Sequence, residues 1–118
     1  MATFSRVLLS GSTDGKPIPV VQTATPGTLL HTAIAGSTSW DEIYLWVSNV
    51  TVADATLTIE WGSVTDPGGH MCKSVVVPAN SPPIPIVTGQ VLNNGAVVRA
   101  FSGTASALNA VGYVNRIQ

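Results

Sequence analysis

The sequence predicts an all-β protein, a single-domain antiparallel β-sandwich or jelly roll of about eight or nine short strands. Turn-forming residues recur at short intervals along the whole chain of 118 residues. The segments between these turns are short and rich in Val, Ile, Leu, Thr and aromatic residues, which favour strands. No window of eleven or more residues keeps a helical period, so we expect almost no helix.

The strands are expected at 5–9, 18–23, 28–34, 42–49, 55–61, 71–77, 84–87, 96–101 and 110–116. Turn sequences such as SGSTDGKP, TDPGGH and PANSPP separate them, because Gly, Pro, Asn and Ser interrupt regular structure. The prolines at positions 78, 82, 83 and 85 cannot donate hydrogen bonds to a sheet. The segment around them should therefore be an edge strand or an extended connection.

Two connections predict hairpins. A short polar segment joins strand 42–49 to strand 55–61. Asn94-Gly95 is the pair best suited to a type I′ turn, because both central positions of that turn need a positive φ. In strand 55–61 apolar residues alternate with polar ones such as Glu60, which predicts one face in the core and one in water.

Residues 1–27 mix extended apolar pieces with Gly, Pro and Thr and show little sustained alternation. They could form the first strands of a single domain covering residues 1–118, or an extended N-terminal arm that lies along a neighbour. The apolar run Val7–Leu9 is too short for the hydrophobic part of a signal peptide, and no stretch approaches the length of a membrane span. We therefore expect neither secretion nor membrane insertion.

Charge is scarce in this chain. Charged residues make up 9% of it, against about 25% in typical soluble domains. Five basic and six acidic residues give a net charge of −1, or roughly one charge per 550 Å² of folded surface. Such a surface protects poorly against self-association, which indicates that other protein covers part of it. The basic residues are scattered singly, which argues against both a nucleic-acid groove and a polybasic membrane patch.

No catalytic or metal site is predicted. Asp41 and Glu42 are adjacent, so in a strand they point to opposite faces. A serine-nucleophile site would need a histidine and an acid around a serine, and no serine lies in a Gly-x-Ser-x-Gly motif. His70 and Cys72 are spaced to share a strand face and one ion, but a loop histidine and a small buried thiol are the simpler interpretation. We expect no enzyme, no metal and no cofactor, and the single cysteine fits a reducing cytoplasm.

The stretch DEIYLWVSNV, residues 41–50, raises the main functional question. Alternation places its aliphatic residues on one face and two large aromatics, Tyr44 and Trp46, on the face where polar residues are usual. Together with Trp40, these rings could be covered by protein or could stack on a sugar. An uncharged aromatic surface is typical of an interface core, so we predict that Trp40, Tyr44 and Trp46 form a protein interface.

The segments LLSGSTDGKPIPV, DEIYLWVSN, LTIEWG and VGYVNRIQ make the sequence resemble small virion proteins of tailed bacteriophages, over most of the chain. The resemblance implies a β-sandwich or jelly-roll head protein of the decoration or cement type. Such proteins are made in the host cytoplasm, sit on the outer capsid surface, often as trimers, and bridge neighbouring major capsid subunits. The resemblance brings no catalytic or ligand residues.

The expected partners are thus further copies of the chain and the major capsid protein, with no nucleic acid and no membrane. Two alternatives remain open. The chain could be a tail, neck or fibre-base component of the virion. It could instead be a receptor- or glycan-binding module that uses Trp40, Tyr44 and Trp46.

Overall fold

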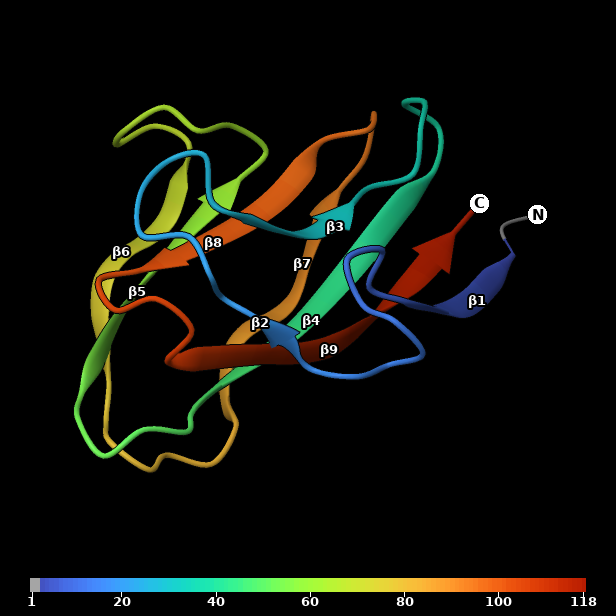
Figure 1. The fold of residues 1–118 in the computed structure, drawn as a ribbon. Helices are drawn as coiled ribbons and strands as arrows, with labels where there is room; N and C mark the ends of the chain where they lie inside the picture. Colours follow the sequence, from blue (N-terminus) through green and yellow to red (C-terminus); the bar gives the residue numbers. More distant parts are fainter. Residues whose placement is uncertain (1–2) are drawn as a thin grey trace.

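The computed structural model describes residues 3–118 as two antiparallel sheets (Figure 1). Sheet A contains, in order, β1 (Phe4–Leu8), β9 (Leu108–Ile117), β4 (Trp40–Asn49) and β7 (Ile84–Leu92), and the short β2 (Ile18–Pro19) also pairs with β9. Sheet B contains, in order, β3 (Thr28–Thr32), β8 (Val97–Ser102), β5 (Ala55–Trp61) and β6 (His70–Val77). The described residues contain no helix that could cross a membrane. They contain no helix of any length, so the all-β prediction is confirmed.

The strand order is that of a jelly roll. If β2 is set aside and the remaining strands are counted along the chain, sheet A has the order 1-8-3-6 and sheet B the order 2-7-4-5. Most consecutive strands therefore lie in different sheets, whereas β5 and β6 pair directly. The predicted β-sandwich or jelly roll is confirmed, and the structure adds the strand order that the sequence left open.

The two expected hairpins are wrong. β4 and β5 lie in different sheets, and so do β7 and β8. The Asn94-Gly95 turn forms, with φ values of 59° and 72° and a hydrogen bond from the Ala96 N–H to the Asn93 carbonyl. Its amides, however, donate to carbonyls of the loop at 34–36, and the flanking strands diverge into the two sheets. A turn sequence fixes the local backbone and not the sheet that the next strand joins.

Asn49 holds the crossing from β4 to β5. Its side-chain amide donates to the carbonyls of Ala53 and Val77 at 2.9 and 3.0 Å, and its Oδ1 accepts the N–H and hydroxyl of Thr51. Because Asn49 is buried, these bonds satisfy its polar atoms and tie the crossing loop to the end of sheet B.

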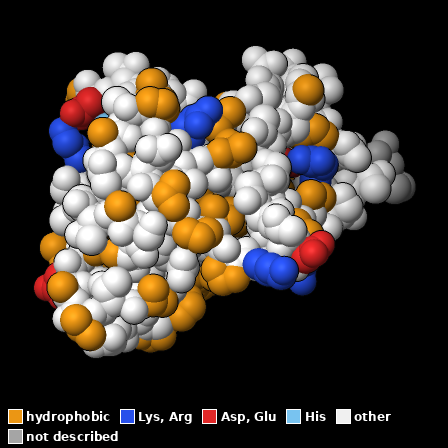
Figure 2. Space-filling model, in the orientation of Figure 1, with side chains coloured by type: hydrophobic (Ala, Val, Ile, Leu, Met, Phe, Trp, Pro, Cys, Tyr) orange, Lys and Arg blue, Asp and Glu red, His pale blue; other side chains and the backbone are white. Residues whose placement is uncertain are grey.

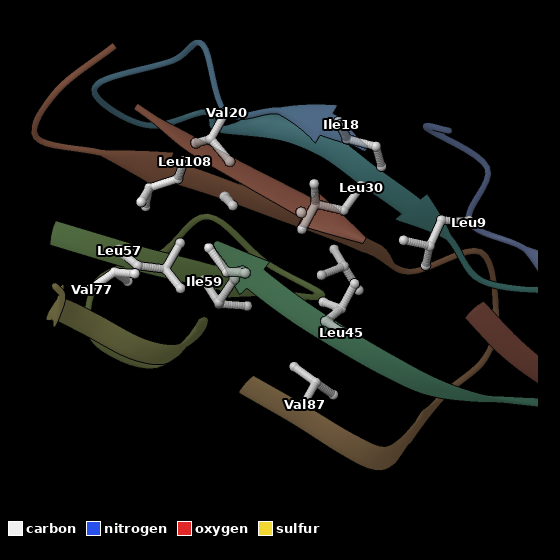
Figure 3. Close-up of a cluster of buried hydrophobic side chains, with 14 of the residues drawn as sticks. Leu9, Ile18, Val20, Leu30, Leu45, Leu57, Ile59, Val77, Val87 and Leu108 are labelled. Carbon is white, nitrogen blue, oxygen red and sulfur yellow. The ribbon is translucent and has the colours of Figure 1, made fainter. Parts of the chain in front are cut away.

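The hydrophobic core lies between the sheets (Figure 3). Ile43, Leu45 and Val47 of β4 and Leu57 and Ile59 of β5 are fully buried there, which confirms the predicted core faces of both strands. Other members of the core are Leu9, Ile18, Val20, Leu30, Val77, Val87, Val98, Leu108 and Val114.

Residues 3–27 lie against this sandwich in the structure. β1 pairs with β9 along five residues, and β2 pairs with the beginning of β9. Leu9, Ile18 and Val20 enter the core. Sheet A reaches past sheet B at the end where both termini lie (Figure 1), so most of β1 is exposed.

Candidate interaction surface

An aromatic row crosses the outer face of sheet A. Tyr44 and Trp46 point away from the core, because Leu45 between them points into it. Tyr113 of β9 lies directly opposite Tyr44. The Tyr44 and Tyr113 rings stack with centroids 4.9 Å apart and planes 15° apart, and Trp46 stacks on Tyr113 at 6.0 Å and 27°. We call Tyr44, Trp46 and Tyr113 the aromatic row.

Arg6 and Gly89 flank this row on opposite sides. The guanidinium carbon of Arg6, on β1, lies 4.6 Å from the centroid of the Tyr113 ring, which is a cation–π contact. Gly89, on β7, has a φ of +98°, and a Cβ atom there would lie 3.1 Å from the Tyr44 hydroxyl oxygen. Since β1 and β7 are the two edges of sheet A, the contacts reach across the whole sheet.

These contacts show what covers the two aromatics within one chain. Tyr44 and Trp46 are half-buried because they stack on each other and on Tyr113. Tyr113 lies between Arg6 and Tyr44, because β1 and β4 are on opposite sides of β9. A sugar stacks on a free ring face. Arg6 and Tyr44 already occupy the faces of the Tyr113 ring, so this ring has no free face for a sugar.

Trp40 does not join the row. It lies roughly 13 Å from Tyr44 along the same strand, and its side chain is 44% exposed. It lines a cavity of about 370 Å³ with Val91 and Leu92 of β7. The structure thus brings Tyr44 and Trp46 together and leaves Trp40 as a separate exposed ring.

More apolar side chains lie on the same outer face. Phe4 and Leu8 alternate with inward-facing residues of β1 and are 71% and 51% exposed. The strands of sheet A place two charged side chains on this face, Arg6 and Glu42, and their charges are opposite. Figure 2 shows charged side chains in small groups, some with acidic and basic residues side by side, and large uncharged areas between them on the visible side of the molecule. The scarcity of charge in the sequence is therefore also a property of the folded surface.

A buried polar network closes the end of the core beside β1. Asp41 of β4 accepts hydrogen bonds from Arg116 Nε at 2.8 Å and from the Ile34 N–H at 3.0 Å, and its Oδ2 lies 2.8 Å from His31 Nε2. Burial alone raises the pKa of Asp41, but the bonds from Arg116 and His31 outweigh it and hold this pKa below its ordinary value. The network joins β3 of sheet B to β4 and β9 of sheet A.

The same network contains a serine. The Ser10 N–H donates to His31 Nδ1 at 3.0 Å, and Ser10 Oγ lies 3.3 Å from that nitrogen. Ser10, His31 and Asp41 therefore lie together, a group that the sequence analysis did not identify. The lone pair of Nδ1 accepts the Ser10 N–H, so it is not free to take the hydroxyl proton. The Oγ atom also accepts the Thr32 N–H at 2.6 Å. These bonds hold the chain after β1 against β3.

The outer face of sheet B is partly covered by the chain itself, and it carries polar side chains beside exposed apolar ones such as Val76. Glu60 is 1% exposed, so the prediction that its side chain faces water is wrong. The Gly27 N–H donates to Glu60 Oε1 at 2.7 Å, and the Thr25 hydroxyl donates to Oε2. The His70 ring packs edge-on against Phe101 with its Nε2 3.9 Å from Glu60 Oε2. Neither ring nitrogen of His70 has a hydrogen-bond partner within residues 3–118.

His70 and Cys72 do not face the same way. Ile59 pairs with Cys72, whereas the next residue, Glu60, pairs with His70, so the register slips between the two pairs. This irregularity turns Cys72 toward the core and leaves His70 beside Glu60. Burial raises the pKa of the Cys72 thiol, which disfavours the thiolate that a metal needs. In the described part of the chain, no group of three or more His, Cys, Asp or Glu side chains could hold a metal ion.

Sequence reasoning missed Tyr113, Arg6 and Gly89 as members of the surface. Tyr113 lies in strand 110–116, which was predicted, and alternation could have assigned it to one face. Its contact with Tyr44 depends on β9 pairing with β4, and these strands are far apart in the sequence.

No protein-family model, curated protein or solved structure matches this chain. The residues and their geometry are thus the basis for a functional proposal.

Proposed function

We propose that the protein is a structural component of a tailed-phage virion, a head decoration or cement protein that binds the outer surface of the capsid lattice and stabilises it. The aromatic row carries this proposal. Tyr44, Trp46 and Tyr113 lie half-exposed on a sheet face with little charge around them. Tyr, Trp and Arg are the residues enriched at the energetic centres of protein interfaces.

Exposed apolar side chains extend this surface toward both edges of sheet A. Phe4 and Leu8 lie on β1, and Val91 lies on β7 with 44% of its side chain exposed. Exposed apolar side chains gathered on one face are a usual mark of an interaction site. The jelly roll itself supports no particular function, because one fold serves many. The support comes from the face of sheet A and from the sequence resemblance.

In this role the protein acts mechanically. The outer face of sheet A lies against the shell at a junction between capsid subunits, and the aromatic row fills hollows there. Each contact contributes a modest free energy, and many copies together oppose expansion and rupture of a head filled with DNA. If the junction geometry exists only in the mature lattice, mass action makes binding selective for that lattice.

Electron cryomicroscopy of virions of the phage that encodes this chain tests the proposal. We expect jelly-roll density on the outside of the head, with the outer face of sheet A toward the shell. Density in the tail, neck or fibre base would give the protein a different structural role. Absence of the protein from purified virions would overturn the proposal.

A glycan-binding experiment on the isolated protein tests the sugar-binding alternative. Trp40 is the ring with the largest exposed share among the three aromatics first identified. Sugar binding that Trp40→Ala abolishes would favour this alternative. If no glycan in a broad panel binds, the result contradicts the sugar-binding alternative and is consistent with the protein-interface proposal.

A further inference from the structure

We infer that β1 is an open sheet edge through which two copies of this chain pair, antiparallel, around a twofold axis at Arg6. The pairing follows from the hydrogen-bond pattern of β1 and does not depend on the proposed virion role.

Alternate backbone groups of β1 face away from β9. Thr3 and Gln118 exchange N–H···O bonds in both directions, so they form a hydrogen-bonded pair at the start of the β1–β9 ladder. Such pairs alternate along an antiparallel ladder. In the continuous register between β1 and β9, Ser5 and Val7 therefore also direct their N–H and C=O groups to β9.

Phe4, Arg6 and Leu8 consequently direct their backbone groups to the free side of β1. β1 is the last strand of sheet A in the part of the chain that the structure describes. None of these outward N–H and C=O groups forms a hydrogen bond within residues 3–118. A row of unpaired backbone groups is a template for the addition of another strand.

The other edge strands carry features that hinder strand addition, and β1 does not. β7 contains Pro85 and Gly89, and its register with β4 shifts twice. β6 has a positive φ of 53° at Ser74, and its register with β5 also shifts twice. β3 has a shift within its five residues. β1 contains no proline and keeps its register with β9 over all five residues.

The residues of β1 are complementary to a second copy of the same strand. When Arg6 of one copy lies opposite Arg6 of the other, Phe4 lies opposite Leu8 on each side of the axis. All three positions have outward backbone groups, so each of the three pairs makes two N–H···O bonds. The exposed Phe4 and Leu8 side chains, on one face, pack against each other across the axis. This self-complementarity favours a second copy over an unrelated strand.

Arg6 is compatible with this pairing. Its guanidinium lies over Tyr113 of β9 and thus leans away from the partner strand. A like-charge pair still remains at the centre of the contact. Salt screens repulsion between exposed charges, so the pairing should tighten as the ionic strength rises.

The contact is isologous, so it joins copies in pairs. The resemblance implies a trimer, and a trimer cannot close through a twofold β1–β1 contact. Two trimers can, however, be linked by such a contact. The mass in solution should therefore correspond to an even number of copies.

The first experiment measures the mass of the full chain by light scattering at about 100 µM, for wild type and for Arg6→Pro. Proline removes the outward N–H of residue 6 and leaves the β9 ladder intact, because that N–H faces the free edge. We expect an even-numbered wild-type assembly and half that mass for Arg6→Pro. The matched control Arg6→Ala keeps the N–H and should keep the wild-type mass. An odd-numbered wild-type assembly, or an unchanged mass in folded Arg6→Pro, would overturn the inference.

A second experiment does not depend on the folding of the proline variant. In the inferred register the two copies of residue 6 have Cα atoms about 5.5 Å apart, which a disulfide can span. Arg6→Cys should therefore oxidise to a covalent dimer. In Ser5→Cys the new thiol faces Val7 of the other copy, so the two thiols lie too far apart and little dimer should form. The wild-type chain, whose one cysteine is Cys72, gives the background. Equal cross-linking of the two variants would contradict the twofold pairing.

Discussion

On sheet B the chain covers part of its own outer face, whereas on sheet A it leaves that face open. Glu60 of sheet B lies beneath Thr25 and Gly27, which satisfy its carboxylate while it is buried. On sheet A, Tyr44 and Trp46 stack on neighbouring rings and remain half-exposed. The chain thus covers Glu60 on sheet B with its own segment before β3 and leaves the aromatic row on sheet A half-exposed. Exposed apolar side chains occur on both sheets, and Val76 of sheet B is one of them.

This difference is the reason why we propose the outer face of sheet A as the place where a partner binds. A buried carboxylate needs donors at fixed positions, and the segment before β3 provides them within the chain. An aromatic surface needs only shape-matched apolar contact, which another protein can provide. Substitutions in the common core, on the closed face of sheet B and on the open face of sheet A should therefore have different effects.

The largest effect is expected in the core that both sheets share. Ile59→Ala should lower the free energy of unfolding by about 2–5 kcal/mol, because it removes buried methyl groups and leaves a cavity. Association should fall only as a consequence of unfolding. Chemical denaturation measures the first quantity, and a loss below about 1 kcal/mol would show that this part of the core is loosely packed.

A smaller effect is expected on the closed face of sheet B. Glu60→Ala should lower the free energy of unfolding by about 1–3 kcal/mol, because the Gly27 N–H and the Thr25 hydroxyl lose their acceptor. The matched control is Glu42→Ala on the outer face of sheet A, which should change stability by less than about 0.5 kcal/mol. Association of the protein with itself and with the proposed partner is also measured for Glu60→Ala and Glu42→Ala. If Glu60→Ala weakened association while stability stayed constant, the closed face would be an interface too.

The network at Asp41 should make stability depend on acid pH. The folded-state pKa of Asp41 is lowered, so its contribution to stability is present above the unfolded pKa of about 3.9 and is lost as pH falls through the folded pKa. Arg116→Gln removes one of the partners that lower this pKa, so the folded pKa moves closer to the unfolded one, and the variant should lose less stability than wild type as the pH falls. Unfolding free energies measured between pH 2 and 7 show the difference. Parallel curves for wild type and Arg116→Gln would contradict this role of Arg116.

Local patterns predicted most of the fold. Alternation found the core faces of β4 and β5, since strand periodicity depends only on neighbouring residues. The proline-rich segment was expected at an edge or in a connection, and Pro85 lies in β7, an edge of sheet A. The strand expected at 84–87 extends to Leu92, and the one expected at 18–23 is limited to Ile18–Pro19.

Contacts between distant residues could not be predicted in the same way. The hairpin expectations failed because pairing depends on which sheet a strand joins, and that choice depends on the whole topology. Glu60 alternates like a solvent-facing residue, and the segment that buries it lies more than thirty residues away. Ser10, His31 and Asp41 meet for the same reason. Alternation placed Tyr44 and Trp46 on one face because they share one strand, and it could not place Tyr113 beside them because that ring lies on the paired strand.

The central claim is that the outer face of sheet A binds a partner, and Trp46→Ala tests it most directly. Binding to the proposed partner, the undecorated phage head, and the free energy of unfolding are measured for this variant and for Ile59→Ala. We expect Trp46→Ala to weaken binding by about 2 kcal/mol or more, which is roughly 30-fold in Kd. Its unfolding free energy should fall by only about 0.5–1.5 kcal/mol, the value of aromatic stacking, and thus by less than in Ile59→Ala. If Trp46→Ala unfolds as easily as Ile59→Ala while its folded fraction binds like wild type, the aromatic row belongs to the packing of the chain itself and the claim is contradicted.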